Sequence, residues 1–240
     1  MPLRRPWAFE RGTLWAIDLD VPAAAAAAAA AATPAPPAPL AGAAFGAVRS
    51  ADVAELDKVM GPSGHQEAGA RLASGRRCYV ARVAGVIAAY GWVSQGRESI
   101  GELERELHMR PGEAYIWDCA TLPAFRRRGL YSALLRYIVG VLRAEGMRRL
   151  WIGASLDNTP SLRSFAAAGF QPVLRLVYLR VLGVRGNWLV GAAAAPPALV
   201  VDARRALGAD RERASAAGLS TPAAHRQAIE ESGSWPSSQN

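Results

Sequence analysis

The sequence predicts a mixed α/β domain in which a central, mostly antiparallel sheet is flanked by helices. The chain has 240 residues, of which 51% are hydrophobic, and this is enough to bury a substantial core. Short apolar runs with the composition of strands follow one another through the middle of the chain, and helical patterns separate some of them. The pattern from Leu130 to Glu145 is the clearest helix, with an apolar stripe that ends before Gly146.

Residues 1–21 are predicted to be an N-terminal extension that carries one strand, because apolar side chains cluster between Gly12 and Pro22. A run of alanines and four prolines follows, too short and too proline-rich for a stable helix, so residues 22–42 are predicted to be a linker. The first residues lack the continuous apolar core of a signal peptide. Together with the absence of an unbroken apolar stretch, this leads us to expect a cytoplasmic protein without a membrane span.

Residues 43–190 are predicted to form the folded domain, and residues 191–240 a flexible C-terminal tail with a transient helix near 203–213. Within the domain, Ala84 and Gly85 are expected to join two strands in a tight hairpin. The expected elements in chain order are a short strand ending at 48, helices over 53–60 and 65–73, strands over 77–83 and 86–93, an extended piece over 100–107, a strand over 114–122, the helix over 130–145, a strand over 149–154, a helix over 159–169 and a strand over 170–182.

The chain is basic, with a formal net charge of +8, and a positive surface favours polyanionic partners such as nucleic acids or phosphorylated cofactors. The arginines are spread over the whole chain without one long basic tract, which argues against nucleic acid. Cys78 and Cys119 lack the spacing of a metal site or a disulfide framework, so buried, reduced cysteines are expected and no metal.

A buried strand, a basic loop with one glycine and an apolar helix follow one another from Ala114 to Leu135. Backbone amides at a helix N-terminus are unpaired, the helix dipole adds positive charge there, and the arginines at 126–128 would neutralise a bound anion. Gly129 would let the backbone approach a phosphate closely. The alternative is that these arginines form only a solvated charge run. A second segment downstream, in which Asn158 precedes a short helix ending in Gly169 and Phe170, favours the phosphate interpretation.

Together the two segments resemble the GNAT superfamily of acyl-CoA N-acyltransferases over roughly residues 45–182. In that family the pattern Arg/Gln-x-x-Gly-x-Gly/Ala opens the helix that binds pyrophosphate, and Arg126 and Gly129 match its first two fixed positions. The family's second motif, an Asn followed by a short helix ending in Gly-Phe, is matched by Asn158 and by Gly169-Phe170. Two departures are Arg127, where Gly is frequent, and Tyr131, where Gly or Ala is usual.

The resemblance implies that the strand over 114–122 splays from the strand over 149–154, and that acetyl-CoA or another acyl-CoA binds between them. Backbone groups of the first strand would pair with pantetheine, amides of the loop and helix start would hold the pyrophosphate, and Asn158 would orient the coenzyme arm. The implied coenzyme-binding residues are Cys119, Ala120, Thr121, Arg126, Arg127, Arg128, Gly129, Leu130, Tyr131, Ser132 and Asn158.

Amine acylation needs a base for the amine, polarisation of the thioester carbonyl and an acid for the thiolate. Asp118 is the first candidate base because it interrupts an apolar strand, with a structural carboxylate as the alternative; Glu102 and Glu104 compete with it. Family members often carry a tyrosine acid on the helix before Gly-Phe, but Phe165 is the residue here. Solvent, Tyr131 or Tyr178 would then protonate the thiolate.

The sequence thus predicts an N-acyltransferase that moves an acetyl or other acyl group from coenzyme A to a primary amine. The acceptor is a small molecule or a peptide, and a homodimer is left open. The alternative is a GNAT-like coenzyme-A-binding or regulatory domain without turnover, since an obvious acid is missing. A nucleic-acid-binding protein is the third hypothesis, based on the arginines.

Overall fold

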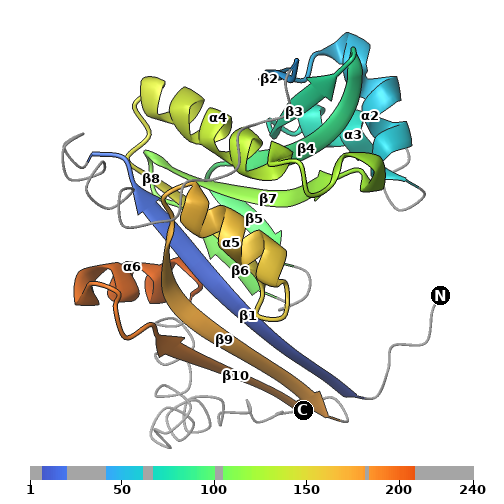
Figure 1. The fold of residues 1–240 in the computed structure, drawn as a ribbon. Coiled ribbons are helices and arrows are strands. Elements are labelled where there is room, and N and C mark those ends of the chain that lie inside the picture. The colour runs from blue at the N-terminus through green and yellow to red at the C-terminus, as the bar shows by residue number, and fades with distance from the viewer. Residues whose placement is uncertain (1–6, 21–41, 62–66, 101–104, 182–183, 209–240) are drawn as a thin grey trace, which may run out of the picture.

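The computed structural model describes residues 7–20, 42–61, 67–100, 105–181 and 184–208, and it contains an eight-stranded sheet with helices on both faces (Figure 1). The predicted mixed α/β architecture with a mostly antiparallel sheet is confirmed. The strand order is β10-β9-β1-β8-β7-β4-β3-β2, and β7 and β8 are the parallel pair within it. The strands of this sheet are β1 (Trp7–Asp18), β2 (Ala44–Ala47), β3 (Arg77–Val83), β4 (Val86–Ser94), β7 (Glu113–Thr121), β8 (Arg149–Ser155), β9 (Gln171–Val181) and β10 (Val184–Gly191).

The extended piece predicted over 100–107 forms part of a separate two-stranded sheet of β5 (Arg97–Ile100) and β6 (Arg105–His108). The helices are α2 (Val53–Met60), α3 (Glu67–Ala73), α4 (Leu130–Ala144), α5 (Thr159–Ala167) and α6 (Pro197–Ala206), with 3-10 turns η1 (Ser50–Asp52) and η3 (Pro123–Phe125). Within the described ranges, no helix is long and apolar enough to cross a membrane.

The β3–β4 hairpin forms where the sequence predicts it. Ala84 has φ 50° and Gly85 has φ 84°, and two successive residues in the left-handed region make the two-residue turn that matches the twist of paired strands. The adjoining β2 pairs with β3 and closes this edge of the sheet.

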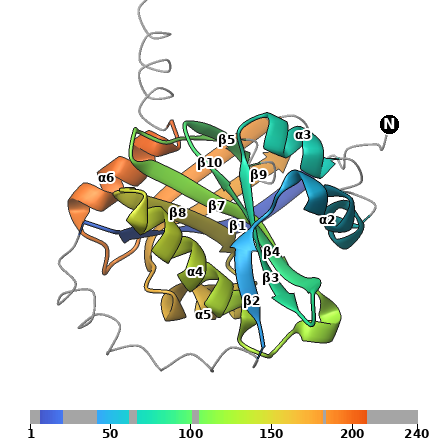
Figure 2. The ribbon, with the colours of Figure 1, turned by 90° about the horizontal axis from the view of Figure 1, so that it is seen from above.

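The N-terminal strand lies inside the sheet. β1 pairs antiparallel with β8 along one edge and with β9 along the other, as Figure 2 shows from above. Leu14 and Ala16 are fully buried because both faces of this part of the sheet are covered. The strand predicted in residues 1–21 is therefore present, and it is structurally integral to the domain. The predicted linker, residues 22–42, lies almost entirely outside the described residues, so the division of the chain there stays a prediction.

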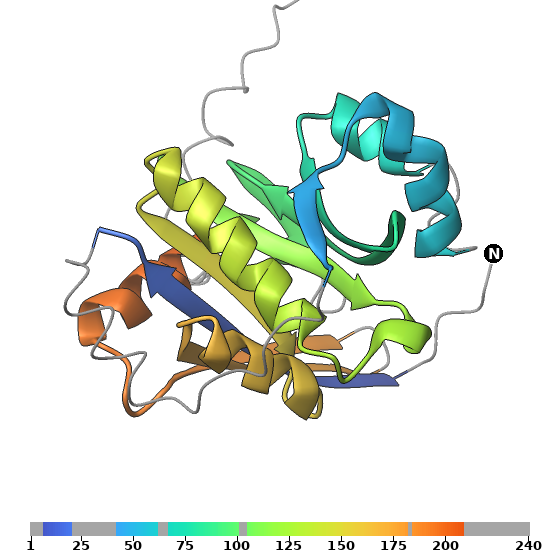
Figure 3. The same ribbon diagram turned by 45° about the horizontal axis from the view of Figure 1, so that its top comes forward.

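Helices cover the sheet in two layers. α4 and α5 lie side by side on one face (Figure 3), where Leu134 and Ile138 of α4 pack with Ile116 and Ile152 of the central strands. On the opposite face α6 and the β5–β6 hairpin cover β1, β8 and β9, while α2 and α3 cover β3 and β4. The central parallel pair, β7 and β8, therefore lies between two helical layers.

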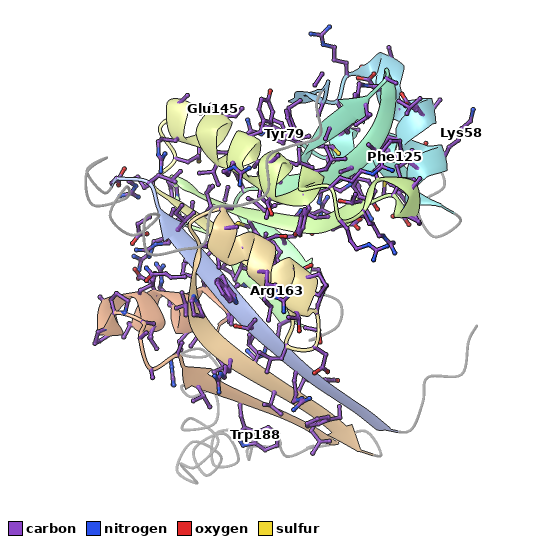
Figure 4. The ribbon with its side chains drawn as sticks, in the orientation of Figure 1. Lys58, Tyr79, Phe125, Glu145, Arg163 and Trp188 are labelled. Carbon is purple, nitrogen blue, oxygen red and sulfur yellow. The ribbon has the colours of Figure 1, made fainter. Side chains whose placement is uncertain are left out.

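The C-terminal part of the domain differs from the prediction in two ways. The single strand expected over 170–182 is followed by a second strand, β10, which pairs with β9 as a hairpin and exposes Trp188 at the sheet edge (Figure 4). The prediction of a flexible tail from residue 191 is wrong for residues 192–208, because α6 packs on the sheet with Leu199, Ala203 and Ala206 buried. These apolar residues recur at helical spacing within a proline- and alanine-rich stretch, which masks their pattern. Residues 209–240 lie outside the described residues.

Candidate active site

β7 and β8 are neighbours over only part of their length. Their pairing ends at Ile116 and Ile152, although β7 ends only at Thr121 and β8 only at Ser155. Figure 1 shows β7 turning away from β8 and β1 beyond this point. The predicted divergence of the two strands is therefore present, and backbone groups on their facing edges do not pair with each other there.

Two features produce the divergence. Asp118 has φ 41°, an unusual conformation that Asp tolerates better than most residues, and the register between β4 and β7 shifts between Tyr90 and Trp92. Such an irregularity bends a strand and increases its twist. β8 keeps its direction because its other edge is paired with β1 from Arg149 to Ser155.

A cavity of about 880 Å³ fills the space between the diverging strands. Its lining changes from one end to the other, because the cavity runs through the plane of the sheet. On the side of α4 and α5 it is lined by Ile116, Cys119, Tyr131, Ile152 and Phe165, with Asn158 and Ser161 at the start of α5. On the side of α6 it is lined by Leu14, Ile100, Tyr115, Trp117, Leu176 and Leu207. Arg71 of α3 and residues Arg11, Gly12 and Thr13 of β1 also line it. A cavity with walls on both sides of the sheet can hold two reactants against each other.

The loop before α4 has the conformation of an anion cradle. Arg127 has φ 61° and Gly129, the N-cap residue, has φ 70°, and no side chain caps the first turn of this helix. Arg126 Nε donates a hydrogen bond to the Thr121 carbonyl at 3.0 Å, which fixes the loop to the end of β7. Uncapped amides at a helix N-terminus beside exposed arginines favour binding of a phosphate.

The predicted coenzyme-binding residues are only partly brought together. Cys119, Tyr131 and Asn158 line the cavity with the candidate base Asp118. Leu130 and Ser132 are buried, so only their backbone groups are available to a ligand. Arg126, Arg127, Arg128 and Gly129 are in the loop before α4, and Ala120 and Thr121 end β7, but none of these six lines the cavity. Glu102 and Glu104 lie outside the described residues.

Asp118 is paired with a cation that the sequence interpretation did not include. Arg71 of α3 forms a short ion pair with Asp118 and a second ion pair with Glu67 at 2.8 Å. Its guanidinium carbon lies 5.1 Å from the ring centre of Trp92 and 4.8 Å from that of Trp117, so two aromatic faces hold it. Direct proton acceptance by Asp118 would require this ion pair to rearrange.

Trp117 is fixed by a buried polar network behind the cavity wall. Its indole nitrogen donates to Ser94 Oγ at 2.7 Å, Ser94 donates to Glu98, and Arg76 donates two hydrogen bonds to Glu98 at 2.7 and 2.9 Å. Burial by itself raises the pKa of Glu98, but the hydrogen bonds from Arg76, Ser94 and the Ser99 amide outweigh it and hold the pKa below its ordinary value. Glu98 is therefore a structural carboxylate.

The three tryptophans of the central strands differ in their burial. Trp92 and Trp151 are fully buried core residues, whereas Trp117 is partly exposed to the cavity. Tyr178, one of the suggested acids, is buried beneath α6 and does not line the cavity. It is therefore not placed to protonate a group bound there.

Tyr131 lies inside the cleft between β7 and α5. Its hydroxyl interacts with the side chains of Cys119 and Ser161. Burial raises the pKa of Tyr131 well above its ordinary value, and its neighbour Cys119 adds to this rise. Burial likewise raises the pKa of Cys119 to about 12, so both groups stay protonated at neutral pH.

Asn158 is the N-cap of α5, where its Oδ1 atom accepts a hydrogen bond from the Ser161 amide at 3.2 Å. Phe165, two turns further along α5, is almost fully buried, and its ring centre lies 6.4 Å from that of Tyr131. An aromatic ring without a donor therefore occupies the position where the resembled family often has a tyrosine.

Sequence reasoning missed the cavity wall that β1 supplies, Arg11 to Leu14, and also Arg71. Arg71 is 47 residues from Asp118 in the chain. No local pattern marks either of them, because each reaches the cavity through long-range packing.

A family model described as the acetyltransferase (GNAT) family matches residues 50–170 of the chain. This range includes β7, the arginine loop, α4 and α5, which carry both motifs and much of the cavity. No curated protein sequence matches the chain significantly.

Two solved structures have a similar fold. A GCN5-related N-acetyltransferase from Sphaerobacter thermophilus superimposes with a TM-score of 0.51 at 19% identity, covering 78% of this chain and 54% of that protein. An acetyltransferase of the GNAT family from Colwellia psychrerythraea superimposes with a TM-score of 0.50 at 11% identity, covering 72% of this chain and 57% of that protein. The chain thus spans just over half the length of both, and at these identities the likeness concerns the fold.

Proposed function

Because this chain belongs to the GNAT acetyltransferase family, we propose that it transfers an acyl group from acyl-coenzyme A, in the simplest case acetyl-CoA, to a primary amine. The observation that carries the proposal is the cavity between β7 and β8, which opens close to an uncapped helix N-terminus with three exposed arginines. An open strand edge and an anion cradle at the same place match a long molecule with an amide-containing arm and a diphosphate.

In this proposal the coenzyme lies on the α4 and α5 side of the sheet. The unpaired edge of β7 at Cys119, Ala120 and Thr121 pairs with the amides of pantetheine. The amides from residue 127 to Ser132 hold the diphosphate, since the Arg126 amide donates to the Pro123 carbonyl, and the side chains of Arg126, Arg127 and Arg128 neutralise it. The Asn158 side-chain nitrogen, which the cap does not use, is available to the coenzyme arm.

The amine enters from the opposite side, between β1, β5 and Trp117. Asp118 stands where the two sides meet and is the proposed base, acting directly or through water once Arg71 has shifted. Glu102 remains a proposed alternative. Because the wall on this side combines Arg71 with apolar and aromatic residues, small-molecule and peptide amines both fit the proposal.

Calorimetry with acetyl-CoA tests the binding half of this proposal, and thiol release across a panel of amines tests the transfer half. Micromolar binding that weakens with salt is expected, because the diphosphate meets exposed arginines. Absence of binding at millimolar acetyl-CoA would end the proposal. Coenzyme A and the same molecule without its thiol serve as matched ligands that separate the contribution of the diphosphate from that of the sulfur.

A second candidate function is coenzyme binding without turnover, as in a regulatory domain. The presence of Phe165 on α5, which lacks the hydroxyl of a tyrosine acid, favours this candidate. It predicts binding of acetyl-CoA with no thiol release for any amine, and measurable release with one amine would exclude it.

A further inference from the structure

Acyl transfer from a thioester releases a thiolate, which a proton donor stabilises. The inference that follows rests on the proposed function. The protic side chains on the α4 and α5 side of the cavity are the Cys119 thiol, the Ser161 hydroxyl, the Asn158 amide and the Tyr131 phenol. Asn158 lies outside the aromatic cluster and caps α5. A serine hydroxyl is too weak an acid, and the Cys119 thiol already donates to the Trp117 carbonyl at 3.5 Å.

Tyr131 combines three properties of a donor to sulfur. It lines the cavity from the first turn of α4, beside the point where β7 leaves β8. The Phe165 ring lies edge-on to it at 65°, and Cys119 packs against the same cluster, so its movement is restricted. Its hydroxyl already interacts with the Cys119 sulfur within the cleft, and this interaction lowers the pKa of that thiol against the larger effect of burial.

The other tyrosine of the cavity has a different environment. Tyr115 packs with Leu14 and Trp151 on the α6 side of the sheet, on the side where the amine is proposed to enter. Its ring therefore belongs to the cluster beneath α6, whereas the ring of Tyr131 packs beside Phe165 on the side where the coenzyme is proposed to lie. Tyr131 is chosen because it lies on the coenzyme side of the cavity.

We propose that Tyr131 is the proton donor to the departing coenzyme thiolate, turning its hydroxyl from the Cys119 sulfur to the coenzyme sulfur. In this step the amine nitrogen forms a bond to the carbonyl carbon, the carbon–sulfur bond breaks and its electron pair stays on sulfur. Sulfur takes the phenol proton, and the phenolate regains a proton that the amine nitrogen has lost, through water. The products are an amide and the coenzyme thiol, and no further reactant is needed.

The phenol is suited to this role because it is protonated throughout the neutral range. Burial and the neighbouring sulfur both keep the proton on oxygen until charge develops on the leaving group. This arrangement would also explain why Phe165 can replace a tyrosine on α5 without loss of the reaction. A phenol from α4 reaches the same cleft from the opposite helix.

The test measures the thiol of bound coenzyme A, so it does not depend on knowing the acceptor. The thiolate absorbance of coenzyme A bound to wild type and to Tyr131→Phe is followed against pH, with coenzyme lacking its thiol subtracted. Loss of a donor to the thiolate should raise the pKa of the bound thiol by about one unit, which is a tenfold change in thiolate fraction. Tyr137→Phe, the same change on the same helix but outside the cavity, should leave this pKa unchanged.

Turnover gives the second readout. With an amine that the wild type accepts, Tyr131→Phe should lower thiol release about a hundredfold while acetyl-CoA affinity stays within about threefold. An unchanged thiol pKa and unchanged turnover in Tyr131→Phe would overturn the role of Tyr131 and leave the proposed function intact. If the wild type binds the coenzyme without turnover, the thiol pKa decides on its own. If the wild type does not bind, the proposed function has failed first.

Discussion

Replacing Gly129 with valine should weaken coenzyme binding far more than it weakens the fold. Gly129 has φ 70° and ψ −1° at the start of α4, and an L-residue in this left-handed region costs about 1–2 kcal/mol. If valine at this position adopts another backbone conformation instead, the backbone amides of the first turn of α4 change direction. Each lost hydrogen bond to a charged diphosphate is worth about 1.5–3 kcal/mol, so the affinity for acetyl-CoA should fall at least about tenfold.

Gly146 provides the matched control, because it has φ 81° just beyond the other end of α4 and open space around its Cα. The two glycines are separated by the 15 residues of the helix, about 22 Å at the usual rise. Gly146→Val should therefore show a similar loss of stability, by denaturant unfolding, with unchanged affinity by calorimetry. Equal affinity in Gly129→Val and Gly146→Val would refute the cradle at the start of α4.

Three further predictions concern the carboxylates and the C-terminal helix. Glu98→Gln should lower the free energy of unfolding by about 3 kcal/mol at pH 7, because it breaks a largely buried ion pair with Arg76. The pKa of Glu98 is lowered from 4.5 in the folded state, so the wild type loses this stabilisation as the pH falls below about 4.5. Urea unfolding should therefore show the free-energy difference between wild type and variant narrowing at low pH. Leu199→Ala should cost about 2–4 kcal/mol of unfolding free energy because α6 is integral, and a change below 0.5 kcal/mol would contradict that. Asp118→Asn, which keeps a residue that tolerates φ above zero, should lower thiol release about a hundredfold with unchanged acetyl-CoA affinity, and full activity would exclude Asp118 as the base.

The parts of the fold that could be predicted from the sequence are those with short-range signals. The stripe of α4, the turn at Ala84 and Gly85, and the strand of β7 are all encoded within a few neighbouring residues. The spacing of Arg126 and Gly129 also indicated an anion cradle before α4. Local sequence is sufficient here because each signal depends on backbone conformation or on one face of one element.

The parts that could not be predicted depend on contacts between distant segments. The sequence marks β1 as a strand, but its place between β8 and β9 is set by packing with residues more than 130 positions away, such as Arg149 beside Asp18. α6 was missed because its buried residues lie among prolines and alanines. The pairing of Arg71 with Asp118 likewise joins a helix and a strand that no pattern connects.

The position of β1 also bears on how the cleft persists without a ligand. β8 is paired with β1 along its whole length, so the strand stays extended and the backbone groups on that edge are hydrogen-bonded. The opposite edge of β8 is not paired with β7 beyond Ile152. β7 is held in the same way by β4, and its bend at Asp118 keeps it from rejoining β8. A ligand therefore does not have to separate two paired strands, and the free energy of binding is not spent on opening the sheet. The N-terminal strand belongs to the site for this reason, although the chain reaches it long before either motif.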